Sequence, residues 1–122
     1  MRPTALLALV IVTATAVVVV GPASALTSTT SVVKVSALAS GLKYNTKVLR
    51  AHPGKIKLVF TNQATIKHNV RIESGEHELG GTKVIGKGQA IAFLSLKKGT
   101  YNFYCSVAGH EDAGMKGKLI VS

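Results

Sequence analysis

The sequence predicts an all-β domain, built as a sandwich or barrel of short strands. Apolar and polar residues alternate in several short runs, turn residues separate these runs, and no stretch has the apolar spacing of an amphipathic helix. A chain of 122 residues has the length of a single domain. Its one cysteine excludes an internal disulfide framework. The sequence also lacks the closely spaced cysteines and histidines that a structural zinc site needs.

The N-terminus has the pattern of a targeting segment. A basic start is followed by an apolar run of 16 residues, Ala5–Val20, then by Gly21-Pro22 and the small residues Ala23-Ser24-Ala25. This pattern predicts that residues 1–25 are a cleaved secretory signal peptide and that the protein is exported to a periplasm, the cell surface or the medium. The run is shorter than the roughly 18–20 residues that span a bilayer, so an uncleaved anchor is the minor alternative. No stable membrane span is expected after cleavage.

The remaining chain is expected to fold as one unit. Residues 26–40 are interpreted as a linker that contains a first strand, Val32–Ala37, and residues 41–122 as the main domain. After a turn at residues 52–54, Lys55–Asn62 alternates and predicts a strand whose inward face carries Ile56, Leu58 and Phe60.

The second half continues the pattern. Residues 67–73 alternate, with His68, Val70 and Ile72 on one face and Asn69 on the other, and residues 74–82 are expected to be a loop. Strands are predicted over residues 89–96, 101–105 and 116–121, with Cys105 on the inward face of the second of these.

The charge is strongly positive. The formal net charge is +10, and loss of Arg2 with the signal peptide leaves +9. Such a charge favours encounter with an acidic partner or an anionic surface. The lysines are scattered and the chain lacks a nucleic-acid-binding motif, so nucleic acid is not an expected partner.

One group of residues has the composition of a metal site. Cys105, His110 and Met115 lie on a single predicted loop between two strands, and His68 is the best candidate for a second imidazole. One thiolate, two imidazoles and a weak thioether form the ligand set of a blue copper site.

Each of these residues also has an ordinary interpretation as a core residue. An unpaired thiol is unusual in an oxidising compartment, however, and a bound metal would account for it. The other two histidines, His52 and His77, lie in predicted turn and loop segments and are expected to be solvated, with a second weak metal contact at His77 as a minor alternative.

The sequence resembles the cupredoxins, in particular the small plastocyanin- and azurin-like blue copper proteins. The resemblance rests on four stretches within residues 42–121, namely residues 53–62, His68-Asn69-Val70, residues 99–105, and His110 with Gly114-Met115-Lys116-Gly117.

The resemblance implies a Greek-key β-sandwich that holds one copper ion and cycles between Cu(II) and Cu(I). It further implies that His68, Cys105 and His110 are equatorial ligands, that Met115 is the axial ligand, and that Asn69 ties the two ligand segments together. Four residues separate Cys105 from His110 and four separate His110 from Met115, which matches neither the plastocyanin nor the azurin spacing.

The resemblance also implies how the protein meets its partners. In the family, the second histidine presents its edge through an apolar patch, for which Val107, Ala108 and Ala113 are the candidates here. The protein is expected to be a monomer, and its positive charge favours redox partner proteins with an acidic docking face.

The predicted function is that of a type 1 copper protein that carries single electrons outside the cytoplasm. A copper carrier or chaperone uses the same four ligands and remains the alternative. A thiol enzyme with Cys105 as nucleophile is disfavoured, because the sequence offers no oxyanion motif and no partner to orient a base, so the protein is not expected to be an enzyme. A purely structural β-domain is the least informative alternative.

Overall fold

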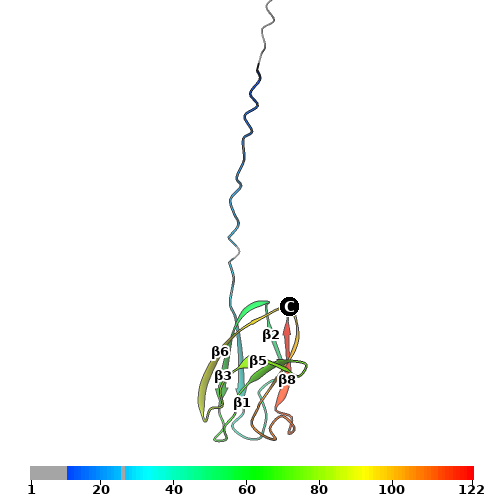
Figure 1. The fold of residues 1–122 in the computed structure, drawn as a ribbon. Coiled ribbons are helices and arrows are strands. Elements are labelled where there is room, and N and C mark those ends of the chain that lie inside the picture. Colours follow the sequence, from blue (N-terminus) through cyan, green and yellow to red (C-terminus); the bar gives the residue numbers. More distant parts are fainter. Residues whose placement is uncertain (1–10, 26) are drawn as a thin grey trace, which may run out of the picture.

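The strands of the protein form two sheets packed face to face (Figure 1). The computed structural model describes residues 11–25 and 27–122, and these residues contain eight strands and no helix. The smaller sheet has the order β1-β3-β6 and the larger has the order β2-β8-β7-β4-β5. The strands are β1 (Ser31–Ala37), β2 (Val48–Ala51), β3 (Gly54–Asn62), β4 (Arg71–Ser74), β5 (His77–Gly81), β6 (Gly88–Leu96), β7 (Gly99–Tyr104) and β8 (Lys116–Val121).

The chain changes sheet repeatedly. It leaves the small sheet after β3, forms β4 and β5 in the large sheet, returns as β6 beside β3, and enters the large sheet again as β7, between β4 and β8. Most neighbouring strands are antiparallel, while β1 pairs in parallel with β3 and β2 with β8. These connections confirm the predicted all-β Greek-key sandwich.

Strand β1 is an integral part of the sandwich. It pairs with β3 along its whole length, and Val33, Val35 and Ala37 are buried. The sandwich therefore begins at Ser31 and continues across the boundary that the sequence suggested after residue 40.

The core lies between the two sheets and is organised around three aromatic rings. Phe60 from the small sheet and Phe103 from the large sheet are fully buried. Tyr44, on the connection between β1 and β2, packs between them, with ring centroids 6.4 Å from Phe60 and 5.4 Å from Phe103. Burial of such side chains is the main favourable term in folding.

The expectation of a loop over residues 74–82 was wrong. Strand β5 occupies His77–Gly81 and pairs with β4 at the edge of the large sheet. The side chains of His77, Glu78 and Leu79 are exposed, so the segment has no alternation of buried and exposed residues to reveal it. Its pairing depends on the backbone, which has positive φ at Gly80 and Gly81.

The segment before β1 lies outside the sandwich. Residues 11–25 and 27–30 have no regular secondary structure, and they extend away from the domain (Figure 1). Their large apolar side chains are exposed, as at Val20, which is 86% exposed. Among the described residues, no helix is long and apolar enough to cross a membrane. Residues 1–10 of the expected signal peptide lie outside the described residues.

Candidate metal centre

The predicted ligand residues gather at one end of the sandwich. Cys105 directly follows β7, Met115 directly precedes β8, and His110 lies on the loop between them. His68 precedes β4, where its backbone N–H and C=O bond to Ile85 at 3.1 and 2.9 Å. The segment before β1 leaves from the opposite end, where His52 bonds to both Ser31 and the C-terminal Ser122.

Backbone hydrogen bonds fold the loop after β7 back on itself. The N–H of Met115 donates to the carbonyl of His110 at 3.0 Å, and the N–H of Cys105 donates to the carbonyl of Met115 at 3.1 Å. Gly109 and Gly114 have positive φ, which lets the loop turn tightly between them. The loop therefore places Cys105, His110 and Met115 around one point although ten positions separate the first from the last.

Three donor atoms form a small triangle. The Nδ1 atoms of His68 and His110 are 3.1 Å apart, and Sγ of Cys105 lies 3.8 Å from the first and 3.5 Å from the second. A point equidistant from three atoms at these separations lies about 2 Å from each, which is close to the bond length between a transition metal and nitrogen or sulfur donors. The triangle therefore fits a metal ion, and its nitrogen and thiolate donors suit copper.

The site is closed to water on all sides except at His110. His68 and Met115 have no exposed surface and Cys105 is 1% exposed, whereas His110 is half-buried. Burial, followed by the nearby His110, lowers the pKa of His68. Its imidazole thus stays neutral, as a metal ligand must. Among the described residues, Nε2 of His68 is the buried polar side-chain atom without a hydrogen-bond partner, so the polar neighbours of this ring are all at Nδ1.

Asn69 connects the two ligand-bearing segments. Its Oδ1 accepts from the N–H of Ser106 and its Nδ2 donates to Oγ of Ser106, both at 2.8 Å, with a longer bond of 3.4 Å to the carbonyl of Thr82. Asn69 follows one candidate ligand and Ser106 follows another. The sequence placed Asn69 on the face opposite His68, but both are buried, because residues 67–70 precede β4 and are not held to strand alternation.

Two buried polar residues that the sequence interpretation missed, Asn62 and Tyr44, stabilise the end of the sandwich that carries the candidate metal centre. Asn62 donates to the carbonyls of Ile66 and Ile85 at 2.8 and 3.0 Å, and so holds both sides of the His68 segment. The hydroxyl of Tyr44 donates to the carbonyl of Asn69 at 2.5 Å. Burial, with Cys105 as a second cause, raises the pKa of Tyr44, which stays a neutral donor. The sequence could have indicated that Asn62 is buried, because it falls on the same inward face of the predicted strand as Phe60. Nothing in the sequence indicated the role of Tyr44.

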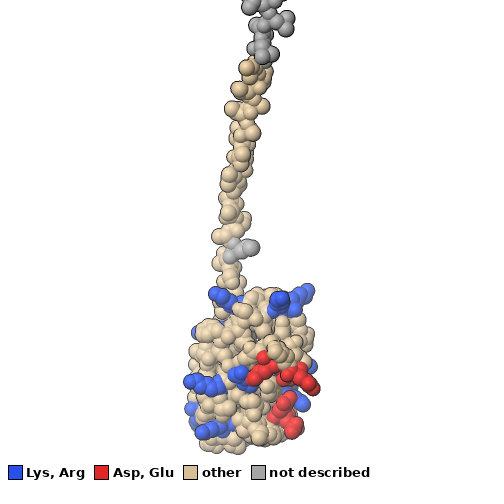
Figure 2. Space-filling model, in the orientation of Figure 1, with Lys and Arg blue, Asp and Glu red and all other residues tan. Residues whose placement is uncertain are grey.

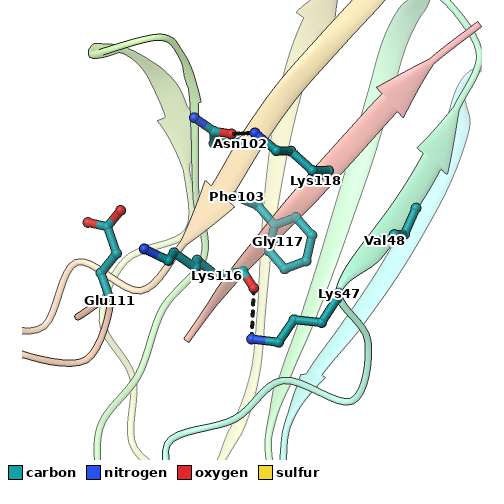
Figure 3. Close-up of a pocket in the computed structure, with 8 residues that line it drawn as sticks. All are labelled: Lys47, Val48, Asn102, Phe103, Glu111, Lys116, Gly117 and Lys118. Carbon is teal, nitrogen blue, oxygen red and sulfur yellow. Dashed lines mark hydrogen bonds between the residues drawn. The ribbon is translucent and has the colours of Figure 1, made fainter. Parts of the chain in front are cut away.

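A lysine holds the methionine side of the loop. Nζ of Lys47 donates to the carbonyl of Lys116 at 3.2 Å (Figure 3). It also donates to the carbonyl of Gly114, so it contacts the residues on either side of Met115. Lys47 lies in a groove of about 550 Å³ on the outer side of β2, β8 and β7. The ring of Phe103 closes the floor of this groove behind Gly117 (Figure 3).

The surface around His110 is partly apolar. Of the three candidates for a docking patch, Ala108 and Ala113 are exposed, while Val107 is half-buried and packs against the core. Ile66 and Val84, on the two segments that flank His68, are 53% and 43% exposed. His52 and His77 are exposed, and neither belongs to the metal cluster.

The acidic residues are restricted to one region. They occur only at residues 73–78 and 111–112, and Figure 2 shows acidic side chains gathered on one part of a surface that otherwise carries lysine and arginine. Tyr104, which precedes Cys105, lies near this region, and burial followed by Glu78 and Glu73 raises its pKa.

Comparisons with known proteins agree with this geometry. Residues 31–122 match the family described as "Copper binding proteins, plastocyanin/azurin family". Plastocyanin from Rumex obtusifolius is 36% identical over an alignment that covers 53% of this chain and 74% of the plastocyanin. Plastocyanin from Mercurialis perennis is 34% identical, with 57% and 79% covered.

Solved structures share the fold. The reduced auracyanin of Roseiflexus castenholzii superposes with a TM-score of 0.71 at 22% identity, covering 75% of this chain and 97% of that one. Auracyanin A, described as a "blue" copper protein from Chloroflexus aurantiacus, superposes with a TM-score of 0.70 at 17% identity, covering 77% and 100%. With the fold, the donor triangle and the sequence match in agreement, this chain belongs to the plastocyanin/azurin family of copper-binding proteins.

Proposed function

We propose that the protein is a type 1 copper protein that carries single electrons between redox partner proteins outside the cytoplasm. In this proposal one copper ion is bound by His68, Cys105 and His110, with Met115 as a weak axial ligand. The observation that carries the assignment is the buried triangle of two Nδ1 atoms and one Sγ atom, which lies next to the backbone of Met115. Bound copper supplies a one-electron Cu(II)/Cu(I) couple.

The protein side chains limit how far the site can rearrange during the redox cycle. Asn69 fixes the start of the Cys105 loop, Asn62 fixes the His68 segment, and Lys47 fixes the carbonyls around Met115. Such outer contacts hold the orientation of ligands and tune their basicity. His110 is the least buried of the four residues, and in this proposal its edge is where a partner approaches, beside Ala108 and Ala113.

The test is a visible absorption spectrum of the chain from residue 26, titrated with Cu(II). An intense thiolate-to-copper band at one equivalent, absent in Cys105→Ser, would support the site. A matched control is Ser106→Ala, which changes a neighbouring side chain without removing a proposed ligand and should keep the band. If Cys105→Ser kept the band, the ligand assignment would be wrong.

The alternative role is a copper carrier that does not cycle electrons. Voltammetry of the loaded protein separates the two, because an electron carrier shows a reversible couple and fast electron self-exchange. An irreversible wave, together with transfer of copper to a competing chelator within seconds, would favour the carrier. No catalytic residue is assigned under either role.

Export through residues 1–25 is part of the proposal. It is supported by the exposed apolar residues 11–20, which take no part in the sandwich, and by the family match, which starts at residue 31. Mass spectrometry of the protein recovered from outside the cytoplasm should find Leu26 as the first residue. An intact N-terminus on membrane-bound protein would identify the segment as an anchor instead.

A further inference from the structure

The outer face of the small sheet is both basic and apolar. Its outward positions carry lysines on β1 and β3 and large apolar side chains on all three strands, β1, β3 and β6, and these strands contain no acidic residue. Phe93 is 73% exposed, Val32 56% and Ile91 49%. Exposed apolar side chains scattered singly are ordinary, but a group of them on one face marks an interaction surface.

Strand register places these residues in two adjacent rows. Val32, Lys57 and Phe93 are cross-strand neighbours in one row, and Lys34, Val59 and Ile91 are neighbours in the next. Each row therefore holds a lysine between or beside apolar groups, with a further lysine, Lys55, two positions before Lys57. We call this set the basic sheet face; its members are Val32, Lys34, Lys55, Lys57, Val59, Ile91 and Phe93.

We propose that the basic sheet face binds the surface of an anionic lipid bilayer. Lysine ammonium groups match lipid phosphates in charge, and their aliphatic stems lie along apolar surface while the charged ends reach the head groups. Phe93 supplies an apolar group that can enter the interface without a preformed pocket. An acidic protein would satisfy the lysines but would need a cavity shaped for Phe93.

The course of the chain supports the bilayer as occupant. Thr30, the last residue before β1, lines a hollow of about 480 Å³ together with Lys55, Phe93, Leu94 and Ser95. The polar residues 27–30, which follow the apolar segment, therefore join the domain beside Phe93. This step rests on the export proposed above, in which the apolar segment contacts the membrane and brings the basic sheet face next to the lipid. The candidate metal centre lies at the far end of the strands and would stay free for partners.

The test is co-sedimentation with vesicles, using the chain from residue 26. All eight strands and every residue of the buried core lie within residues 31–121, so this chain contains the whole sandwich. We expect binding to mixed phosphatidylglycerol–phosphatidylcholine vesicles that is lost in high salt, and little binding to phosphatidylcholine alone. Lys57→Gln should weaken the partition coefficient about fivefold, and Phe93→Ser about tenfold. Lys118→Gln, an equal charge change on the other sheet, is the control and should alter it less than twofold.

A fluorescence reporter tests which face enters the lipid. The chain contains no tryptophan, so Phe93→Trp gives a single signal. Its emission should shift to the blue with anionic vesicles and be quenched by brominated acyl chains, while Leu79→Trp on β5 should not respond. Equal binding by Lys57→Gln and Lys118→Gln, or a silent Phe93→Trp, would overturn the proposal. Self-association without vesicle binding would overturn it in favour of a second copy as occupant.

Discussion

At the scale of single residues, the site is held together by polar side chains that bridge segments distant in sequence. Asn69 is the clearest case. Its side-chain oxygen accepts a hydrogen bond from the N–H of Ser106, and its backbone carbonyl accepts one from the hydroxyl of Tyr44. Asn69 is 3% exposed and makes two bonds of 2.8 Å to Ser106, and each such bond contributes about 0.5–1.5 kcal/mol.

Replacement of Asn69 by alanine should therefore weaken both fold and site. Asn69→Ala removes both bonds to Ser106, and we expect a loss of roughly 1–3 kcal/mol in the free energy of unfolding and a 10- to 100-fold loss in copper affinity. Urea unfolding of the copper-free protein and a competitive chelator titration measure the two effects. Ser106→Ala removes only the bond to Oγ and should have the smaller effect on both; equal losses in the two variants would argue against the backbone contact as the source.

The residue scale also shows what sequence could predict about the site. The candidate ligand residues could be predicted from the sequence, because a thiol, an imidazole and a thioether on one short loop are typical of a site for a soft metal ion. Their convergence with His68 was predicted from strand parity, and the cluster of His68, Cys105 and His110 confirms the convergence although His68 and Cys105 lie just outside β4 and β7. The roles of Tyr44 and Thr82 could not be predicted from the sequence, because they depend on contacts made only after the sheets pack.

At the scale of elements, alternation predicted most of the strands that have one buried face and missed β5, which has none. The predicted runs ending at Ala37, Asn62, Leu96 and Val121 end where β1, β3, β6 and β8 end. Strand β5 is an edge strand with mostly exposed side chains, so its pairing is determined by backbone geometry instead.

The edge pairing of β5 makes a prediction at Gly81. This residue has a φ of 146° and lies opposite Arg71, and a Cβ here would press against the backbone of Val70 and Arg71. Gly81→Ala should destabilise the protein by about 2–3 kcal/mol, since the conformation is essentially restricted to glycine. Gly86→Ala is the matched control, because its Cβ would meet open space, and thermal unfolding should barely change. A Gly81→Ala variant as stable as wild type would show that β5 is free to move.

The contact between the start of β2 and the Met115 loop makes another prediction. Lys47→Met keeps the length of the side chain but removes the ammonium group that binds the carbonyls of Gly114 and Lys116. We expect a loss of about 1 kcal/mol in stability, faster amide exchange at residues 114–116, and a changed ratio of absorption bands in the copper-loaded protein. Lys118→Met, which removes only an exposed bond to Asn102, should leave the bands unchanged. Unchanged bands in both variants would mean that Lys47 does not position Met115.

At the scale of the whole molecule, repulsion among positive charges acts on the fold. The net charge is +10, and within the described residues the only ion pair joins Arg71 to Glu78. Self-repulsion of this kind destabilises a compact state and is screened by salt, because the Debye length falls from about 30 Å at 0.01 M to about 10 Å at 0.1 M. The lysines are spread over both sheets, and the pair between Arg71 and Glu78 offsets only one of the positive charges.

Salt should therefore stabilise this protein. Between low and moderate NaCl we expect the free energy of unfolding of the copper-free chain from residue 26 to rise by roughly 0.5–1 kcal/mol, the scale of exposed charge interactions. Urea unfolding at each salt concentration measures it. The double variant Lys97→Glu/Lys98→Glu changes two exposed residues in the turn before β7 and lowers the net charge by four, so its response to salt should be smaller. A fall in stability with salt would mean that the attraction between the acidic region, residues 73–78, and the surrounding cations outweighs the repulsion.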